Sequence, residues 1–309
     1  MSRVRRLLPG LGVLLALGLL ARVIAASVPV GSHLVVVIGV GVLLANTVGV
    51  PDWASAGVGT YDRWLEAGIV LMGATVGLGQ VLDAGGRVLL VVGLSVCTTL
   101  VTVEVLSRAV FDVPEKVGSL LAAGSGVCGV SAITAVAGGI GYPAVGRFLG
   151  LSDVVFGVWA GATMFSTGPV TAAGFAHSRT AGEWAVLVKL TRNALIGVVA
   201  IGDALYYTRR GVSAASVGSK PRYLWRTFPK FVLGFVLLML LGSAGAFSST
   251  QTAVLGTVSD WSFLLAFAGL GLSIDVREFR EMGLRPVGVV LTSLVLVSTT
   301  VLLVLLALL

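Results

Sequence analysis

Long apolar segments, separated by short polar connections, recur along the whole chain of 309 residues. Each is close to the 18 or more apolar residues that a helix needs to cross roughly 30 Å of hydrocarbon. Backbone groups in lipid must be paired internally, which a helix achieves by itself. The pattern therefore predicts an all-α polytopic membrane protein with about ten transmembrane helices. The predicted spans are residues 7–27, 31–49, 64–82, 86–108, 117–140, 150–168, 182–207, 228–246, 251–273 and 285–309.

Composition and charge agree with a membrane location. Hydrophobic residues make up 56% of the chain and charged residues only 11%, with a mean hydropathy of +1.02, whereas soluble domains carry about 25% charge. The basic residues behind the net charge of +7 are concentrated at the N-terminus and in the segment 209–230, as is typical of connections beside membrane spans. The first apolar segment contains Arg22 and is followed at once by further spans, so it is interpreted as an uncleaved span and not as a signal peptide. We therefore expect a multi-pass protein of the plasma membrane that contacts the lipid bilayer and no nucleic acid.

Two segments of the sequence resemble each other. Residues 73–92 and 271–290 align without gaps, and in both a span ends, an acidic residue and a glycine follow, and an arginine opens the next span. The related segments extend over 67–108 and 265–309. Internal repeats are typical of secondary transporters whose two halves move around a central site, although chance similarity between apolar segments is the alternative. No separate soluble domain is predicted, so residues 1–309 are expected to form a single transmembrane domain.

The span count conflicts with the charge pattern. With a cytoplasmic N-terminus, seven spans place the basic connection 209–227 outside the cell, against the positive-inside rule. The two copies of the repeat then lie six spans apart and run parallel, not inverted. One further crossing between them removes both conflicts. Either residues 141–181 contain that crossing, or this chain lacks a helix.

The predicted span 117–140 contains a concentration of glycine and small polar residues. Each interior glycine costs about 1 kcal/mol of helix stability relative to alanine, so an unwound turn is favoured, which a bilayer tolerates only where protein or water covers it. A half-helix beginning there would direct its anion-attracting N-terminal end into the protein. Close helix packing through small residues is the alternative interpretation. The residues of this candidate site are Ser125, Gly126, Cys128, Gly129 and Ser131.

Residues 159–178 are a second candidate for a discontinuous helix. Glycine, proline, serine and threonine interrupt an otherwise apolar segment here, and these residue types weaken a continuous helix. A plain loop between two spans explains the same pattern. Thr167 in this segment and Asn46 in the second predicted span are weaker candidates for contacts with a substrate.

One predicted span carries charged residues. Four polar side chains of the span 182–207 fall within one stripe of the helix at 100° per residue. They are Lys189, Arg192, Asn193 and Asp203. A lysine or arginine at the centre of a membrane helix costs about 2.5–3.5 kcal/mol, so two cations in one turn are not expected to face lipid. They form either a cationic site for an anionic substrate or a structural ion pair with Asp203 or Glu104, unless they reach an interface by snorkelling.

Enzyme motifs are absent from the sequence. It contains no His–Glu zinc motif, no Gly-x-Ser-x-Gly and no P-loop, so we expect no enzymatic activity, no cofactor and no coupling to ATP within this chain. Cys97 and Cys128 lie in apolar segments and suggest neither a disulfide framework nor a metal site. Cys128 as a nucleophile would need a base, and His33 and His177 are remote from it in sequence.

Five segments point to a known family. They are GIVLMGATVGL at 68–78, GSGVCGVSAITAVA at 124–137, VFGVWAGAT at 155–163, VKLTRNALI at 188–196 and LGLSIDVREFREMGLRP at 270–286. Together they resemble the YeiH-type family of bacterial and archaeal membrane proteins, which are described as sulfate exporters. That family is similar to cation/proton antiporters and anion transporters, in which two discontinuous helices cross near the membrane centre. The resemblance implies an elevator or rocking mechanism.

Two departures from the family pattern affect these expectations. The family usually has a complete span before the segment GYPAVGRFLGLSD, which here begins at residue 141 directly after AVAGGI. The loss of that span would explain both conflicts in the span count. The family also tends to have a His–Asp pair and a later glutamine where this chain has Phe165, Ser166 and Pro169, so proton coupling through that pair is not implied. The positions that do match are Thr167, Lys189, Arg192 and Asn193.

These features predict a secondary transporter of small anions, such as sulfate or organic sulfonates and carboxylates, with H⁺ or Na⁺ as a counter-ion. The substrate is expected to bind between the half-helix end at Ser125–Ser131 and the stripe of Lys189, Arg192 and Asn193. A passive anion channel and a non-transporting, degenerate membrane paralogue are the alternatives. Assembly as a homodimer is left open.

Overall fold

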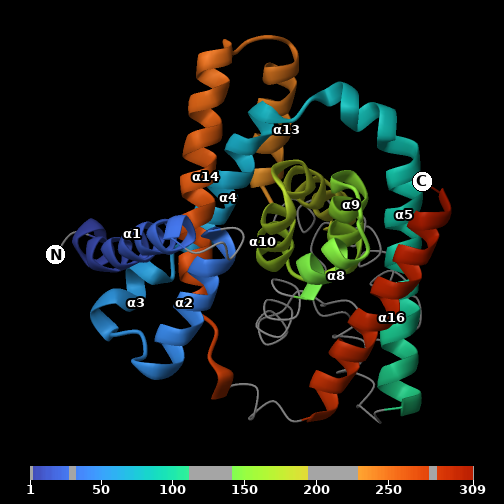
Figure 1. The fold of residues 1–309 in the computed structure, drawn as a ribbon, viewed down its shortest axis with the longest axis horizontal. Coiled ribbons are helices and arrows are strands. Elements are labelled where there is room, and N and C mark those ends of the chain that lie inside the picture. The colour runs from blue at the N-terminus through green and yellow to red at the C-terminus, as the bar shows by residue number, and fades with distance from the viewer. Residues whose placement is uncertain (1–2, 28–32, 111–140, 194–228, 278–283, 309) are drawn as a thin grey trace, which may run out of the picture.

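The computed structural model describes residues 3–27, 33–110, 141–193, 229–277 and 284–308, and all regular structure within these ranges is helical (Figure 1). The elements are α1 (Arg3–Ser27), α2 (His33–Thr47), α3 (Asp52–Val58), α4 (Tyr61–Met72), the 3-10 helix η1 (Gly73–Thr75), α5 (Leu78–Val105), the π-helix η2 (Leu106–Val110), α8 (Tyr142–Phe148), α9 (Asp153–Thr163), α10 (Thr167–His177), α13 (Phe231–Ser243), α14 (Ser249–Leu272) and α16 (Leu284–Leu308). Residues 179–193 are also helical.

Four of the described helices are long and apolar enough to cross a membrane. These spans lie in α1, α5, α14 and α16, at Arg5–Ser27, Gly85–Val105, Ser249–Leu272 and Gly288–Ala307. The helices α2 and α13 are apolar but shorter. The described part of the chain is thus that of a helical membrane protein, but the predicted count of ten spans is not confirmed. The predicted span 117–140 lies wholly outside the described residues.

Two predicted spans are not single helices. In the segment 64–82, α4 ends at Met72 and is followed by η1 and by two extended residues, Val76 and Gly77, before α5 begins. Gly73 allows this break to lie directly on α13, because a Cβ atom there would be only 2.4 Å from the carbonyl oxygen of Phe235. In the segment 150–168, α9 ends at Thr163. Hydropathy alone did not reveal either interruption.

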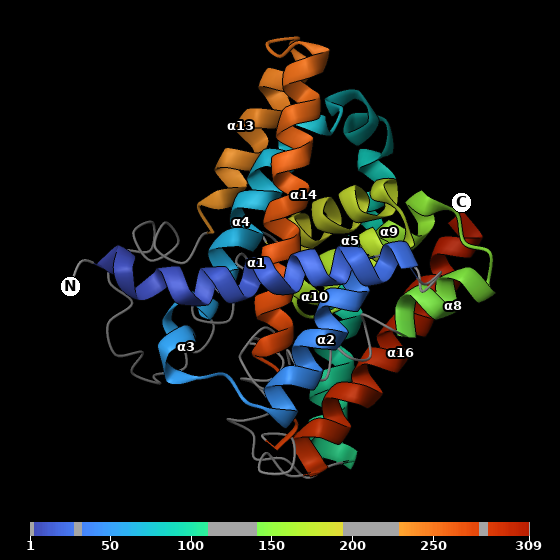
Figure 2. The ribbon, with the colours of Figure 1, turned by 60° about the vertical axis from the view of Figure 1, so that its left-hand side comes forward.

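The turn between α13 and α14 shows how local sequence sets the ends of these helices. α13 is followed by Gly245 at a φ of 75°, a left-handed conformation that costs glycine nothing. α14 then begins with a capping box, in which the Ser248 side chain accepts from the backbone N–H of Gln251 and the Gln251 side chain accepts from the backbone N–H of Ser248. The two helices are therefore joined by a short turn and run in opposite directions (Figure 2).

The buried apolar side chains fall into two clusters. The first holds α1 to α4, α13 and α14 together, with residues such as Leu14, Ile69 and Phe267. The second joins α5, α8, α9 and α16, with residues such as Val92 and Val297. α10 and residues 179–193 contribute to both clusters. They therefore lie between two helix bundles, as Figure 1 shows.

Corresponding helices of the two repeat-related segments pack in opposite directions. In the pair α4 and α14, Gly68 lies against Phe263, whereas Tyr61, seven positions earlier in the chain, lies against Gly269. The Ser259 hydroxyl also donates a hydrogen bond to the Gly68 carbonyl at 2.7 Å. In the second pair, Figures 1 and 2 show α16 rising toward the C-terminus beside α5, which descends. Each copy thus contributes a helix, a break and a second long helix, and the equivalent helices are antiparallel.

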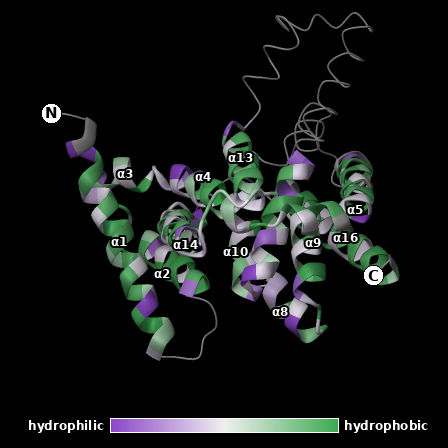
Figure 3. Cartoon of the chain, turned by 90° about the horizontal axis from the view of Figure 1, so that it is seen from above, coloured by the Kyte–Doolittle hydropathy of each residue, from purple (hydrophilic) through white to green (hydrophobic). Residues whose placement is uncertain are grey.

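Helix α1 runs across α14 instead of alongside it (Figures 1 and 2). It approaches α3 backbone to backbone, since a Cβ atom on Gly10 would be 2.2 Å from the carbonyl oxygen of Ala54. Farther along α1, the Arg22 guanidinium lies 4.1 Å from the centroid of the Trp261 ring of α14. Because the two helices cross, they do not both follow the normal of one flat bilayer. Figure 3 shows hydrophobic residues along α1, α5 and α16.

Candidate functional site

The glycine-rich segment 159–178 contains the break that the sequence predicts, but in another form. α9 and α10, of 11 residues each, are separated by three non-helical residues. Gly157 lies against Ala181 and Gly161 against Ala185, so α9 runs parallel to the helical residues 179–193. α10 precedes that helix by a single residue and folds back along it, so α9 and α10 are antiparallel. The segment is therefore a helical hairpin, and each arm, about 16 Å long, is half the thickness of a hydrocarbon core.

The two cations of the predicted stripe bind the tip of this hairpin. The Lys189 ammonium donates to the carbonyl oxygens of Met164 at 3.0 Å and Phe165 at 2.7 Å. The Arg192 Nη1 donates to the same Met164 oxygen at 2.8 Å. Met164 and Phe165 directly follow α9, at the end where the dipole of this helix is negative. Lys189 and Arg192 therefore stabilise the end of α9.

These two cations are buried, as their cost in lipid leads us to expect. Lys189 is 2% exposed and Arg192 is 1% exposed. Neither forms an ion pair with a carboxylate in the described ranges; the other polar contact of Arg192 is a 3.3 Å hydrogen bond to the Thr99 hydroxyl. Asp203, one of the predicted ion-pair partners, lies outside the described residues.

The charge at the tip is not balanced within the described part of the chain. The end of α9 supplies about half a negative charge against the two positive charges of Lys189 and Arg192. The Arg192 Nε is buried and has no hydrogen-bond acceptor among the described residues, and its guanidinium lies 5.5 Å from the centroid of the Phe165 ring. An excess of positive charge beside an unpaired N–H donor suits an anion.

Three other helices fix the position of the tip. The Ser95 hydroxyl of α5 donates to the Ala162 carbonyl. The Tyr142 hydroxyl of α8 is hydrogen-bonded to that of Thr163 at 2.8 Å. The Trp159 indole donates to the Ser298 carbonyl of α16 at 2.9 Å. The tip is thus held from α5, α8 and α16, and the two cations face a preorganised backbone.

The remaining described candidates take different positions. Thr167 is the first residue of α10 and is half-buried, next to the tip. The N-cap, Ser166, makes no side-chain capping bond, so its hydroxyl satisfies none of the first N–H groups of α10. Asn193 is half-buried at the end of the described helical residues. The candidates Ser125, Gly126, Cys128, Gly129 and Ser131 lie outside the described residues.

Asn46 connects two elements instead of facing the hairpin tip. Its amide nitrogen donates to the carbonyls of Val42 and Ile274, both at 2.8 Å, and its amide oxygen accepts from the Val276 N–H at 2.8 Å. Ile274 and Val276 follow the end of α14, so Asn46 attaches α2 to the break in the second repeat-related segment. These bonds occupy both hydrogen atoms of the amide.

We expect Asn46→Ala to lower the free energy of unfolding by about 2–3 kcal/mol, because two long-range hydrogen bonds of about 1 kcal/mol each are lost and backbone groups become unpaired. Thermal unfolding of the purified variant in detergent measures this loss. Thr47→Ala is the matched control, because the neighbouring hydroxyl bonds only within its own helix. An Asn46→Ala variant as stable as the control would contradict a structural role, and Asn46 would again be a candidate for contact with the substrate.

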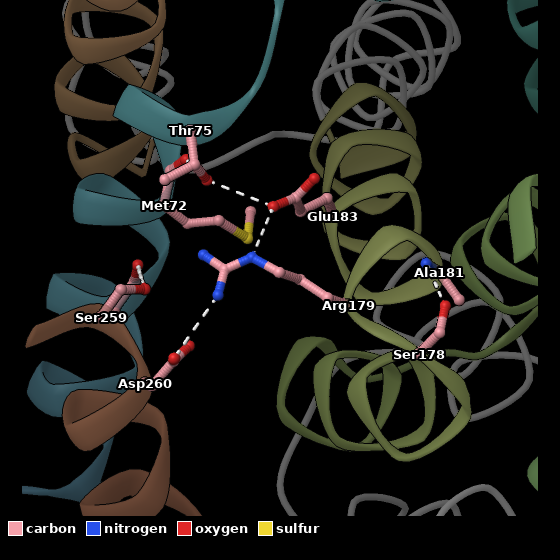
Figure 4. A network of polar contacts seen from close by, with 9 residues as sticks. Met72, Thr75, Ser178, Arg179, Ala181, Glu183, Ser259 and Asp260 are labelled. Atoms are coloured by element: carbon pink, nitrogen blue, oxygen red, sulfur yellow. Dashed lines mark hydrogen bonds and ion pairs between the residues drawn. The ribbon is translucent and has the colours of Figure 1, made fainter. Parts of the chain in front are cut away.

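A second polar cluster was missed by reasoning from the sequence. The Arg179 Nε lies 3.3 Å from the Glu183 Oε1, and its Nη1 lies 3.5 Å from the Asp260 Oδ2 of α14. The Thr75 hydroxyl donates to the same Glu183 oxygen at 3.2 Å (Figure 4). The signal in the sequence was Asp260 itself, a lone carboxylate within an apolar span of 24 residues.

The chain matches a known family model in two pieces. The model is described as conserved hypothetical protein 698, and it matches residues 9–141 and 138–290. The two pieces meet at residues 138–141. This is the point at which the sequence predicts that a complete span is missing.

Relatives with similar sequences are named only as membrane proteins. A UPF0324 membrane protein of Bacillus cereus is 29% identical over 302 residues, which cover 89% of this chain and 84% of the relative. Another, of Oceanobacillus iheyensis, is 29% identical over 311 residues, covering 91% of this chain and 90% of the relative. A third, of Rhodopirellula baltica, is 32% identical over 275 residues, covering 77% and 50%. No solved structure matches the chain.

The alignment lengths carry information about the missing span. The alignment with the Bacillus cereus relative is 302 positions long but covers only 89% of the 309 residues of this chain, or about 275 residues. Roughly 27 positions of the relative (302 minus about 275) therefore have no counterpart in this chain. This is about the length of one membrane helix with its connection. Together with the interrupted family match, this supports the loss of a span.

Proposed function

The chain belongs to the family described as conserved hypothetical protein 698, and relatives with similar sequences are named membrane proteins. From this premise we propose that the chain is a secondary transporter of small anions. Sulfate and organic sulfonates or carboxylates are the proposed substrates, the plasma membrane is the proposed location, and H⁺ or Na⁺ is the proposed counter-ion. No enzymatic step is part of the proposal.

The observation that carries the proposal is the pair of buried cations at the hairpin tip. Lys189 and Arg192 are almost fully buried and pair with carbonyl oxygens, not with carboxylates of the described residues. A charge inside a membrane protein is expensive and marks a substrate or ion pathway by default. The unpaired Arg192 Nε gives an incoming oxyanion a donor that no described protein group uses.

The arrangement of helices supports transport over passive conduction. The equivalent helices of the two repeat-related segments pack antiparallel, which is the relation expected of inverted repeats in secondary transporters. One arm of the hairpin, α9, belongs to the second of two bundles that have separate apolar cores, and the other arm, α10, lies between them. In the proposed mechanism the bundles move relative to each other and expose the hairpin tip to alternate sides of the membrane.

Uptake by reconstituted protein tests this proposal. Purified full-length chain in proteoliposomes should accumulate radiolabelled sulfate above its equilibrium concentration when a proton or sodium gradient is imposed, and protein-free liposomes should not. Uptake that only follows the sulfate gradient would instead identify a passive channel.

A third outcome is that this chain takes up no sulfate, and the interrupted family match gives that outcome a specific meaning. The Bacillus cereus relative, reconstituted in parallel, provides the comparison for the span that we propose this chain has lost. Sulfate uptake by the relative and none by this chain would identify a degenerate paralogue, and the transport proposal for this chain would be wrong.

A further inference from the structure

One buried hydroxyl of α16 has no partner in the described part of the chain. Ser293 is 0% exposed, and its Oγ makes no hydrogen bond with any described residue. A serine in a helix can donate to the carbonyl four residues earlier, but Ser293 does not. It lies three positions after Val290 and four before Val297, on the face of α16 that joins the second apolar cluster. A buried polar group without a partner costs free energy, so a ligand is one explanation for it.

The equivalent serine of the other repeat-related segment binds the hairpin. The ungapped alignment of residues 73–92 with 271–290, continued by three positions, places Ser293 opposite Ser95. The Ser95 hydroxyl donates to the Ala162 carbonyl near the end of α9. α16 also reaches α9, because its Ser298 carbonyl accepts from the Trp159 indole. Each repeat-related segment thus brings a buried serine beside the hairpin, and only the first of the two hydroxyls is used by a described residue.

The directions of the helices place Ser293 on the tip side of Ser298. Along α5, the contact of Ser95 with α9 precedes the contact of Thr99 with Arg192, which binds the tip. α5 therefore runs toward the tip. α16 is antiparallel to α5 (Figures 1 and 2), so the residues of α16 that precede Ser298 lie closer to the tip than Ser298 does.

The spacing along the helices gives the depth of Ser293. The bond between Trp159 and Ser298 aligns α9 with α16. From this bond, Thr163 at the end of α9 lies about 6 Å nearer the tip and Ser293 about 7.5 Å nearer, at 1.5 Å per residue. The Ser293 hydroxyl therefore lies at the depth of the hairpin tip, where the two buried cations bind.

Three donors at this depth are not used by described residues. The Lys189 ammonium has three N–H donors, of which two bind the carbonyls of Met164 and Phe165. The Arg192 Nε and the Ser293 hydroxyl supply the other two. A sulfonate presents three terminal oxygens and sulfate presents four, whereas a carboxylate presents only two. A third donor therefore distinguishes between these classes of anion.

We propose that Ser293 completes the anion site at the hairpin tip by donating a hydrogen bond to a third substrate oxygen. The site then prefers sulfate and sulfonates to carboxylates. The substrate contacts α16 of the second repeat-related segment as well as the helix 179–193. This inference rests on the proposed function and narrows its substrate class.

Methanesulfonate and acetate are a matched pair of probes for this preference. Both are singly charged and carry one methyl group, and they differ in the number of oxygens. Each displaces radiolabelled sulfate from the purified full-length protein in detergent, which gives its affinity. Ser293→Ala should bind methanesulfonate about tenfold more weakly than the wild type, because one hydrogen bond to a charged group is lost. Its affinity for acetate should equal that of the wild type.

Ser107→Ala is the matched control. Ser107 is also 0% exposed, and its Oγ has no partner among the described residues. It lies in η2, 12 positions after Ser95 and thus roughly 18 Å farther along the chain, so the affinities of this variant for both probes should equal those of the wild type. Thermal unfolding of Ser293→Ala without anion should occur at the same temperature as in the wild type or higher, because the substitution removes a buried hydroxyl that has no partner.

The possible results separate this inference from the proposed function. If Ser293→Ala keeps both wild-type affinities, or loses affinity for both probes equally, while the wild type accumulates sulfate in proteoliposomes, the inference is wrong and the proposed function stands. A lower unfolding temperature of Ser293→Ala would also contradict the inference, since the hydroxyl would then have a structural partner. If the wild type neither binds nor transports sulfate, both are wrong.

Discussion

Arg192→Gln should lower the sulfate affinity of the reconstituted protein by roughly 10- to 150-fold, equal to about 1.5–3 kcal/mol for one lost hydrogen bond to a charged group. Glutamine keeps part of the length and an NH₂ donor group but removes the positive charge and the unpaired Nε. Lys189→Met should have an effect of similar size, since the ammonium is lost while the aliphatic stem is kept. Concentration-dependent uptake of radiolabelled sulfate, divided by the amount of folded protein in the liposomes, measures both effects.

The hairpin provides a matched control for this experiment. Arg147 of α8 donates to the Ala176 carbonyl at 2.9 Å, near the end of α10, much as Arg192 donates near the end of α9. Arg147→Gln removes a comparable bond at the base of the hairpin and should leave sulfate uptake per folded molecule unchanged. If Arg192→Gln and Arg147→Gln both reduce only the amount of folded protein, then the cations at the tip are structural and the transport site lies elsewhere.

Gly161→Ala should separate the hairpin from the helix that carries the two cations. A Cβ atom at residue 161 would be 2.5 Å from the Ala185 carbonyl oxygen and 2.8 Å from the Val188 Cβ. The first is a backbone atom that no rotamer change can move, so the helices must shift apart. Overpacking of this kind costs about 1–3 kcal/mol, and more where backbone is involved. Thermal unfolding should show this loss, and sulfate uptake should fall with it because the Met164 carbonyl moves away from Lys189.

Gly93→Ala in α5 is the control for this substitution. Nothing lies within 4 Å of a Cβ atom at residue 93, so alanine should be neutral there or should stabilise the helix by up to about 1 kcal/mol. Equal thermal stabilities for Gly161→Ala and Gly93→Ala would show that α9 is not packed on the helix 179–193 as described.

The sequence was most informative where a single residue type carries a large energy. Two cations in an apolar helix predicted burial of Lys189 and Arg192, and both are buried. Their partners were not predictable, because the bonds join residues 24 to 28 positions apart and depend on the direction in which α10 folds back. Glycine and proline indicated a break in the segment 159–178, but not whether the chain continues or reverses after it.

The predicted count of ten spans is not confirmed, and one reason is related. Hydropathy reports how apolar a helix is but not whether lipid or protein covers it. The eight residues Phe156–Thr163 of α9 are all buried within the protein, yet they have the composition of a membrane span. The Arg179–Asp260 pair was missed because its members lie 81 positions apart. Nothing in the pattern of either segment indicates that its charged residue has a partner in the other.

The bonds that fix the hairpin tip also impose an order on biosynthesis. The hairpin and the helix 179–193 are translated after α5 but long before α16, whose Ser298 carbonyl receives the Trp159 indole across 139 positions. Lys189 and Arg192 therefore enter the membrane when only part of the final cover is available. Contacts between such distant segments form late. The arrival of α16 completes the set of bonds that hold the hairpin in place, and until then the two charges must be kept hydrated or shielded by the insertion machinery.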